Sequence, residues 1–153
     1  MLNDILFPIH SLSNIDIEQI LDIYKVKGKV IARDMIPKKI PINSCLVINL
    51  DDSSGGGTHW VCLCNSKKSK RLLYYDPFGI DYPPQEVLEM KTKKGIVANN
   101  SQHQHIDSIL CGYYCLKVIK SIFVDEMNYL DTMRQFTDNP SFHNKDIADN
   151  LEL

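Results

Sequence analysis

The first half of the chain begins with a hydrophobic pattern that predicts an amphipathic helix. Apolar side chains between Ile17 and Tyr24 recur at helical spacing, which places them on one face of a helix over about 14–24. The preceding Ser13-Asn-Ile-Asp16 has the arrangement of a capping box, with Asp in place of the usual Glu. We therefore expect a helix that starts after Ser13 and ends before Gly28.

Three apolar segments then predict strands. INSCLVINL (42–50), HWVCLCN (59–65) and RLLYYD (71–76) are rich in aliphatic, β-branched and aromatic residues, as buried strands are. The glycine-rich DDSSGGG separates the first segment from the second, and the polar run 66–70 is typical of a hairpin turn. The lysine-rich, proline-interrupted stretch before residue 42 predicts no regular element.

The second half of the chain predicts mainly helices. PPQEVLEMKTKK (83–94) fits a helix because proline is tolerated in a first turn. GIVANN (95–100) suggests a short strand. From Cys111 onward apolar residues occupy a helical face with few polar neighbours, which predicts a mostly buried helix, and two more helical segments are expected at about 126–136 and 144–152.

Composition narrows the class of protein. The chain has 153 residues, 44% of them hydrophobic, with 7 Gly and 7 Pro, which predicts one packed α+β domain over 1–153 with a central sheet and helices against it. The net charge of −2 does not demand a nucleic acid or a membrane as partner. No secretion signal or apolar run of ~20 residues is present, so we expect an intracellular protein without a membrane span. Its five cysteines should be reduced thiols.

One cysteine stands where a reactive thiol is expected. Cys111 lies where the polar segment 101–108 becomes the apolar helix, and a helix N-terminus stabilises a thiolate. His59 starts a predicted strand after the glycine loop, and Asp76 ends the neighbouring strand, so antiparallel pairing could bring both to one end of the sheet. The pair would then serve as general base and orienting carboxylate, while Gln104 could donate its amide to an oxyanion.

Taken singly, these residues have ordinary structural explanations. Cys111 could be a buried core thiol, His59 a structural histidine, Asp76 a turn residue and Trp60 a core aromatic. A zinc site built from cysteines and histidines is the main competing chemistry, but no Cys-x-x-Cys pair occurs, so no metal is expected. It is the joint order of the residues that favours catalysis.

That order resembles a known family of proteases. GGGTHW (55–60), YYDPFG (74–79), a following Gln and LCGYYC (110–115) resemble the adenovirus-type maturation cysteine proteases, the adenain family, in the clan that includes the Ulp/SENP SUMO proteases. The resemblance spans residues 55–115. It implies a papain-like or adenain-like fold, with a mostly antiparallel central sheet and the nucleophile at the N-terminus of a buried helix.

The resemblance also assigns the catalytic roles. By it, Cys111 is the nucleophile, His59 the general base, Asp76 its orienting carboxylate and Gln104 the oxyanion donor. The expected activity is a cysteine endopeptidase that cleaves glycine-containing sites in viral capsid or core precursors during virion maturation. The expected location is the virion and the cytoplasm or nucleus of the infected host cell, and the expected state is a monomer.

The expected substrates are extended peptide segments of viral structural precursors. The glycines before His59 would leave room for the backbone of an extended peptide. The tryptophan after His59 would cover this peptide and exclude larger side chains. The glycine beside the nucleophile is also expected to contact the substrate. These substrate-binding residues are Gly56, Gly57, Trp60 and Gly112.

Several features leave alternatives open. The adenoviral enzymes carry Glu at the acid position, whereas Asp76 matches the SUMO proteases, so a SUMO- or ubiquitin-like deconjugating protease is the alternative, and a catalytically silent interaction module is another. The resemblance implies no required cofactor and leaves stimulation by DNA or by an activating peptide open. A disulfide-linked peptide is not expected, because no cysteine lies between Asp76 and Gln104.

A basic cluster raises the question of DNA binding. Weak nucleic-acid binding through this cluster competes with the simpler interpretation that it forms a solvated turn. The cluster consists of Lys67, Lys68, Lys70 and Arg71.

Overall fold

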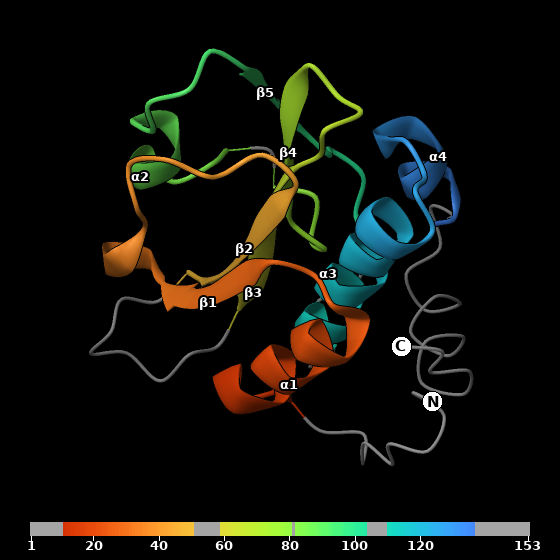
Figure 1. Cartoon of the computed structure of the whole chain (residues 1–153). Helices are drawn as coiled ribbons and strands as arrows, with labels where there is room; N and C mark the ends of the chain where they lie inside the picture. Colours follow the sequence, from red (N-terminus) through yellow and green to blue (C-terminus); the bar gives the residue numbers. More distant parts are fainter. Residues whose placement is uncertain (1–10, 51–58, 81, 104–109, 137–153) are drawn as a thin grey trace.

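The protein has an α+β fold built on one five-stranded sheet. The computed structural model describes residues 11–50, 59–80, 82–103 and 110–136. The strands lie side by side in chain order (Figure 1). They are β1 (Gly28–Ala32), β2 (Ser44–Asn49), β3 (Trp60–Asn65), β4 (Arg71–Tyr75) and β5 (Gly95–Ala98). The two central pairs, β2–β3 and β3–β4, are antiparallel, and the two outer pairs are parallel.

Helices cover both faces of this sheet. The α-helices are α1 (Asn14–Tyr24), α2 (Gln85–Leu88), α3 (Cys111–Ile119) and α4 (Tyr129–Arg134). A 3₁₀ helix, η2 (Arg33–Met35), follows β1, and a π-helical segment, η3 (Lys120–Val124), continues α3. α1 and α3 pack in one hydrophobic core on one face, while α2 belongs to a second core on the other face (Figure 1). The expected fold class is confirmed.

The central strands are apolar throughout because they are buried on both faces. Every residue of β3 is buried, as are all residues of β2 except the last. Successive side chains of a strand point to opposite faces, so Cys45 and Val47 pack toward α1 and α3, whereas Leu46 and Ile48 pack toward α2. The continuous apolar runs that predicted these strands therefore reflect a sheet between two layers.

The first helix begins and ends as its sequence predicts. The Asp16 amide donates to the Ser13 hydroxyl, and the Ser13 amide donates to the Asp16 carboxylate, which completes the capping box. At the other end Lys25 adopts a left-handed conformation, with φ of 57°, and its amide donates to the Asp22 carbonyl. This reversal directs the chain into β1.

The other predicted elements agree with the structure in part. We predicted no element between the first helix and residue 42, but β1 occupies Gly28–Ala32 there; its half-buried edge position explains the weak apolar signal. The predicted helix over 83–94 is wrong in length, because Pro84 is extended and α2 covers only Gln85–Leu88. The helix expected at 144–152 lies outside the described residues. The predicted β3–β4 hairpin is confirmed, as is the short strand β5.

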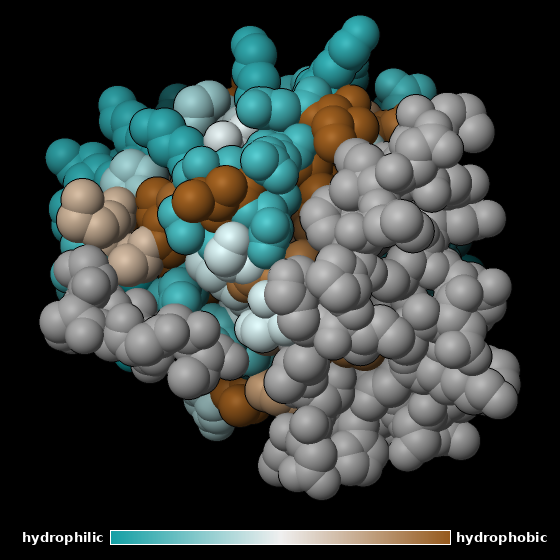
Figure 2. Space-filling model, turned by 90° about the horizontal axis from the view of Figure 1, so that it is seen from below, coloured by the Kyte–Doolittle hydropathy of each residue, from teal (hydrophilic) through white to brown (hydrophobic). Residues whose placement is uncertain are grey.

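The surface carries isolated hydrophobic side chains. Ile15, Ile42 and Leu130 are each about 60% exposed and belong to different parts of the fold. The face seen from below shows such residues in small groups among hydrophilic ones (Figure 2), which is ordinary for a protein surface. In the part of the chain that the structure describes, no helix is long and apolar enough to cross a membrane.

Candidate active site

The pairing of β3 with β4 determines where His59 lies. Cys62 is the register partner of Tyr75 in this antiparallel pair. His59 directly precedes β3 and Phe78 lies three residues after β4, at the same end of this antiparallel pair, and the two rings are stacked with their centroids 4.4 Å apart. The backbone is held on its other side as well, because the His59 carbonyl accepts from the Leu50 amide at 2.9 Å.

The antiparallel pairing of β3 with β4 also brings Asp76, which directly follows β4, close to the His59 imidazole. The distance from His59 Nε2 to Asp76 Oδ1 is 2.8 Å, and the Asp76 side chain is only 1% exposed. A carboxylate can only accept, so Nε2 carries the proton in this pair. Nδ1 is thereby left as the ring nitrogen available to take a proton from another group.

A tight turn after β4 holds the Asp76 carboxylate. Asp76 Oδ1 also accepts from the Phe78 amide at 2.8 Å, and the Gly79 amide donates to the Asp76 carbonyl at 2.8 Å. Gly79 has φ of 76°, and a Cβ there would lie 2.6 Å from the backbone of Ser101. Only glycine fits this position, which explains the Asp-Pro-Phe-Gly sequence in physical terms.

Asn99, immediately after β5, clamps the main chain of Asp76. Its Oδ1 accepts from the Asp76 amide at 2.8 Å, and its Nδ2 donates to the Asp76 carbonyl at 2.7 Å. Both bonds are buried, so no water replaces them when one partner is lost. The sequence did not identify Asn99, because its partner Asp76 is 23 residues away. Nothing in the neighbouring sequence distinguishes it from an ordinary loop asparagine.

Replacing Asn99 with alanine should lower the free energy of unfolding by about 1–3 kcal/mol, because the Asp76 amide and carbonyl lose buried partners. Urea denaturation followed by circular dichroism measures this loss. Asn100 is the matched control, since it is exposed and neighbours Asn99, and Asn100→Ala should change stability by less than about 0.5 kcal/mol. Equal losses in the two variants would contradict the clamp.

Cys111 occupies the first turn of α3 beside His59. The Trp60 amide points at its sulfur, with 3.4 Å between nitrogen and Sγ. The Cys115 thiol, one turn later, donates to the Trp60 carbonyl at 3.6 Å. These two contacts dock the start of α3 against the start of β3. The helix N-terminus and the Trp60 amide both favour negative charge on the Cys111 sulfur.

The thiol and the imidazole interact but are not aligned for a hydrogen bond. Cys111 is close enough to raise the pKa of His59, yet His59 Nδ1 has no partner of good hydrogen-bond geometry among the described residues. We take the pair as adjacent, with proton transfer requiring a small reorientation. Catalytic hydrogen bonds are often long in the free enzyme and shorten when substrate binds.

The protonation of His59 is strongly perturbed. Burial lowers its pKa, but the hydrogen bond to Asp76, the adjacent Cys111 side chain and the negative charges of both raise it more, from 6.5 to about 9. The imidazole is therefore mainly protonated at neutral pH. A cation in this position stabilises a thiolate on the neighbouring sulfur.

The remaining predicted residues divide into two groups. Gln104, Gly56 and Gly57 lie outside the described residues. Trp60 is 5% exposed, and its indole Nε1 donates to the Leu12 carbonyl at 3.0 Å. A Cβ on Gly112 would lie 3.3 Å from the Leu12 side chain and 3.5 Å from Trp60 Cδ1, so this glycine permits close packing of α3. Substrate binding by Trp60 and Gly112 stays a prediction.

The other four cysteines belong to the core. Cys45, Cys62, Cys64 and Cys115 are all free and at most 1% exposed, and burial is the main reason that the pKa of three of them is raised. For Cys64 the interaction with the Cys62 side chain raises the pKa first, and burial adds to it. Within residues 11–50, 59–80, 82–103 and 110–136, no group of three or more His, Cys, Asp or Glu side chains could hold a metal ion.

Sequence comparison provides no relatives for this chain. No protein-family model matches it, and no curated protein matches it.

Solved cysteine proteases share the fold. The ASFV pS273R protease superposes with a TM-score of 0.56 at 16% identity, over 90% of this chain and 67% of that chain. The SUMO protease Ulp1, with its catalytic cysteine oxidized to a sulfinic acid, superposes with a TM-score of 0.52 at 16% identity, over 94% of this chain and 80% of that chain. At this identity the likeness shows a common fold, and the activity has to be argued from the site.

Proposed function

We propose that this protein is a cysteine peptidase whose nucleophile is Cys111. One observation carries the proposal: Cys111 at the start of a buried helix lies beside His59, which is hydrogen-bonded through Nε2 to the buried Asp76. A thiol, a base and an orienting carboxylate in this relation are the arrangement that activates a nucleophilic cysteine. The likeness to two cysteine proteases supports the same conclusion.

The first half of the reaction acylates the enzyme. With the proton of the Cys111 thiol already held on His59 Nδ1, the sulfur attacks the carbonyl carbon of the scissile peptide bond as a thiolate. The negative charge then moves to the carbonyl oxygen, to which the amide of Cys111 at the helix N-terminus would donate. His59 gives the proton to the leaving amine, the C–N bond breaks, and a thioester remains.

The second half releases the product. Water loses a proton to His59 Nδ1 and adds to the thioester carbonyl. The C–S bond breaks, the carboxylic acid leaves, and the proton stays on His59, which restores the Cys111 thiolate beside the imidazolium. Throughout, Asp76 holds Nε2 protonated and stabilises the imidazolium, so Nδ1 remains the nitrogen that exchanges the proton. Gln104 is the proposed side-chain donor to the oxyanion, and this assignment rests on the sequence resemblance.

The substrates we propose are glycine-containing segments of viral structural precursors. The sequence resemblance to the adenain family supports this proposal, as does the likeness to a protease of ASFV. The site of action would be the virion and the infected cell. Stimulation by DNA or by an activating peptide belongs to the same proposal.

Removal of a SUMO- or ubiquitin-like modifier is the second candidate. Two observations favour it: the orienting acid is Asp76, as the sequence resemblance implies for SUMO proteases, and the fold is that of Ulp1. Both activities would use the same Cys111 chemistry. They differ in whether a short peptide is sufficient or a folded modifier is needed.

A covalent probe tests the nucleophile directly. A peptide ending in Gly-Gly-vinyl sulfone reacts with a thiolate to form a stable thioether, and intact mass followed by peptide mapping locates it. We expect a single label on Cys111 in the native protein, no label in Cys111→Ala, and labels on several cysteines after unfolding in urea. The other four thiols should stay unreactive while folded, because burial and a raised pKa suppress their thiolates.

The probe results separate the candidates. Labelling by the short peptide probe, together with hydrolysis of glycine-containing peptides, supports the endopeptidase. Labelling only by a SUMO- or ubiquitin-vinyl sulfone would favour the deconjugase. Absence of any Cys111 label, with DNA and precursor peptides added, would reject a peptidase and favour an interaction module.

A further inference from the structure

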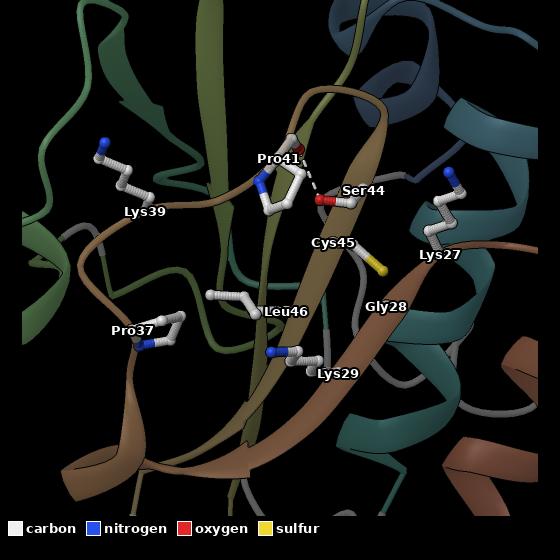
Figure 3. Close-up of a pocket in the computed structure, with 9 residues that line it drawn as sticks. All are labelled: Lys27, Gly28, Lys29, Pro37, Lys39, Pro41, Ser44, Cys45 and Leu46. Atoms are coloured by element: carbon white, nitrogen blue, oxygen red, sulfur yellow. Dashed lines mark hydrogen bonds between the residues drawn. The ribbon is translucent and has the colours of Figure 1, made fainter.

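A cavity lies beneath the connection between β1 and β2. It has a volume of about 450 Å³, which is within the range of small-molecule sites. The segment from η2 to β2 passes over the sheet here, with Pro37 and Pro41 on one side and the β1 backbone on the other (Figure 3). Cys45 and Leu46 of β2 also line it, and both are buried.

The interior of this cavity is largely apolar. The only hydroxyl among its lining residues, that of Ser44, is already used, because it donates to the Pro41 carbonyl at 2.5 Å. Pro37, Pro41 and Leu46 therefore present mainly carbon atoms to the cavity. A ligand body that enters here gains by removing apolar area from water.

The lining residues with charge are all positive. Lys27, Lys29 and Lys39 line the cavity with exposed side chains, and no Asp or Glu does so. None of the three is in an ion pair with any residue of the described segments. Three lysines and no acidic residue in the lining make the surroundings of the cavity positive and favour an anion, even though the chain as a whole has a net charge of −2.

We propose that this cavity binds a small amphipathic carboxylate. Its apolar body would lie between the two prolines over Leu46, and its carboxylate would remain at the mouth among the lysines. A lysine ammonium is a compact charge on a flexible side chain, so it can approach an anion at the opening of the cavity without a fixed geometry. A phosphate group is more often held by arginine or by backbone amides at a helix N-terminus, and the lining has neither.

The cavity is separate from the candidate active site along the sheet. It lies at the start of β2, where Ser44 pairs with Asn65 at the end of β3. The candidate active site lies at the opposite end of this strand pair, where Asn49 pairs with Trp60. Occupation of the cavity is therefore a property beyond the proposed peptidase function and can be measured without any assay of activity.

Sodium octanoate is the probe, titrated into the ¹⁵N-labelled full chain and followed by NMR amide shifts. We expect saturable shifts centred on residues 27–29 and 44–46. Octylammonium carries a similar alkyl chain with a positive charge, and octan-1-ol carries it without charge. Both should bind more weakly than octanoate. Octyl phosphate distinguishes the head groups and should bind no better than octanoate.

Charge reversal at the cavity provides the decisive variant. Lys27→Glu, Lys29→Glu and Lys39→Glu together should weaken octanoate binding by at least about tenfold. The control Lys67→Glu, Lys70→Glu and Lys93→Glu makes the same charge change at exposed lysines elsewhere and should leave binding within about twofold. Equal losses in both variants, absent or scattered shifts, equal binding of octylammonium, or tighter binding of octyl phosphate would each overturn the proposal.

Discussion

Replacing His59 with alanine should lower kcat/KM for a glycine-containing peptide by about 10³-fold at pH 7, within the range that general acid–base catalysis supplies. The reason is that both the proton of the Cys111 thiol and the proton of the leaving amine pass through this imidazole. Loss of the imidazolium also removes the cation that favours the thiolate. Initial-rate kinetics of the wild type and the variant measure the effect.

A chemical rescue separates this role from a folding defect. Alanine leaves a space beside Asp76, and added imidazole can occupy it and carry protons as His59 does. We expect imidazole to restore part of the lost rate in His59→Ala and to leave the wild type unchanged. A variant that retains near wild-type activity would exclude His59 as the base.

Replacing Asp76 with asparagine should lower kcat/KM by about 10²–10⁴-fold, because a neutral amide no longer stabilises the imidazolium or sets its tautomer. The same change should move the pKa of His59 down from about 9, since the hydrogen bond and negative charge of Asp76 are two of the causes that raise it. NMR titration of the histidine resonances measures the pKa, and a pH–rate profile measures the activity.

The raised pKa of His59 also makes the stability of the folded protein depend on pH. The folded-state pKa of His59 is about 9 and the ordinary value is 6.5, so the protonated form stabilises the folded protein. This contribution is complete below about pH 6.5 and is lost as the pH rises through about 9. Asp76→Asn should therefore reduce the loss of stability between these two pH values.

Denaturation curves at a series of pH values provide the check on Asp76. The wild type and Asp76→Asn should differ most near pH 6 and converge above pH 9.5. Parallel curves across the whole range would mean that Asp76 does not set the charge state of His59. Unchanged activity in the variant would remove Asp76 from the proposed mechanism.

Local patterns were sufficient for the elements that depend on near neighbours. The capping box around Ser13 and Asp16 joins residues three positions apart, and it forms as predicted. The apolar runs of β2 and β3 are also visible in the sequence, because both strands are buried on both faces. An edge strand such as β1 has fewer buried side chains, so its pattern was too weak to identify.

The candidate site shows the same division. The residue types and their order along the chain identified His59, Asp76 and Cys111. Asn99 was not identified, because its two bonds to Asp76 depend on how β5 lies beside β4. The backbone contact of Trp60 with the Cys111 sulfur was also missed, because every residue carries an amide and only the packing of α3 selects this one.

What the sequence determined by itself was the set of chemical groups, their order, and the helices and strands that carry them, since these depend on composition and on short-range periodicity. The tertiary structure decided which groups meet. The antiparallel pairing of β3 with β4 brings His59, Phe78 and Asp76 to one end of the sheet, where the His59 ring stacks on Phe78 and lies 2.8 Å from Asp76, and the packing of α3 on β3 brings Cys111 to the same end. Contacts between distant residues arise from register and packing over the whole core, and no local pattern encodes them.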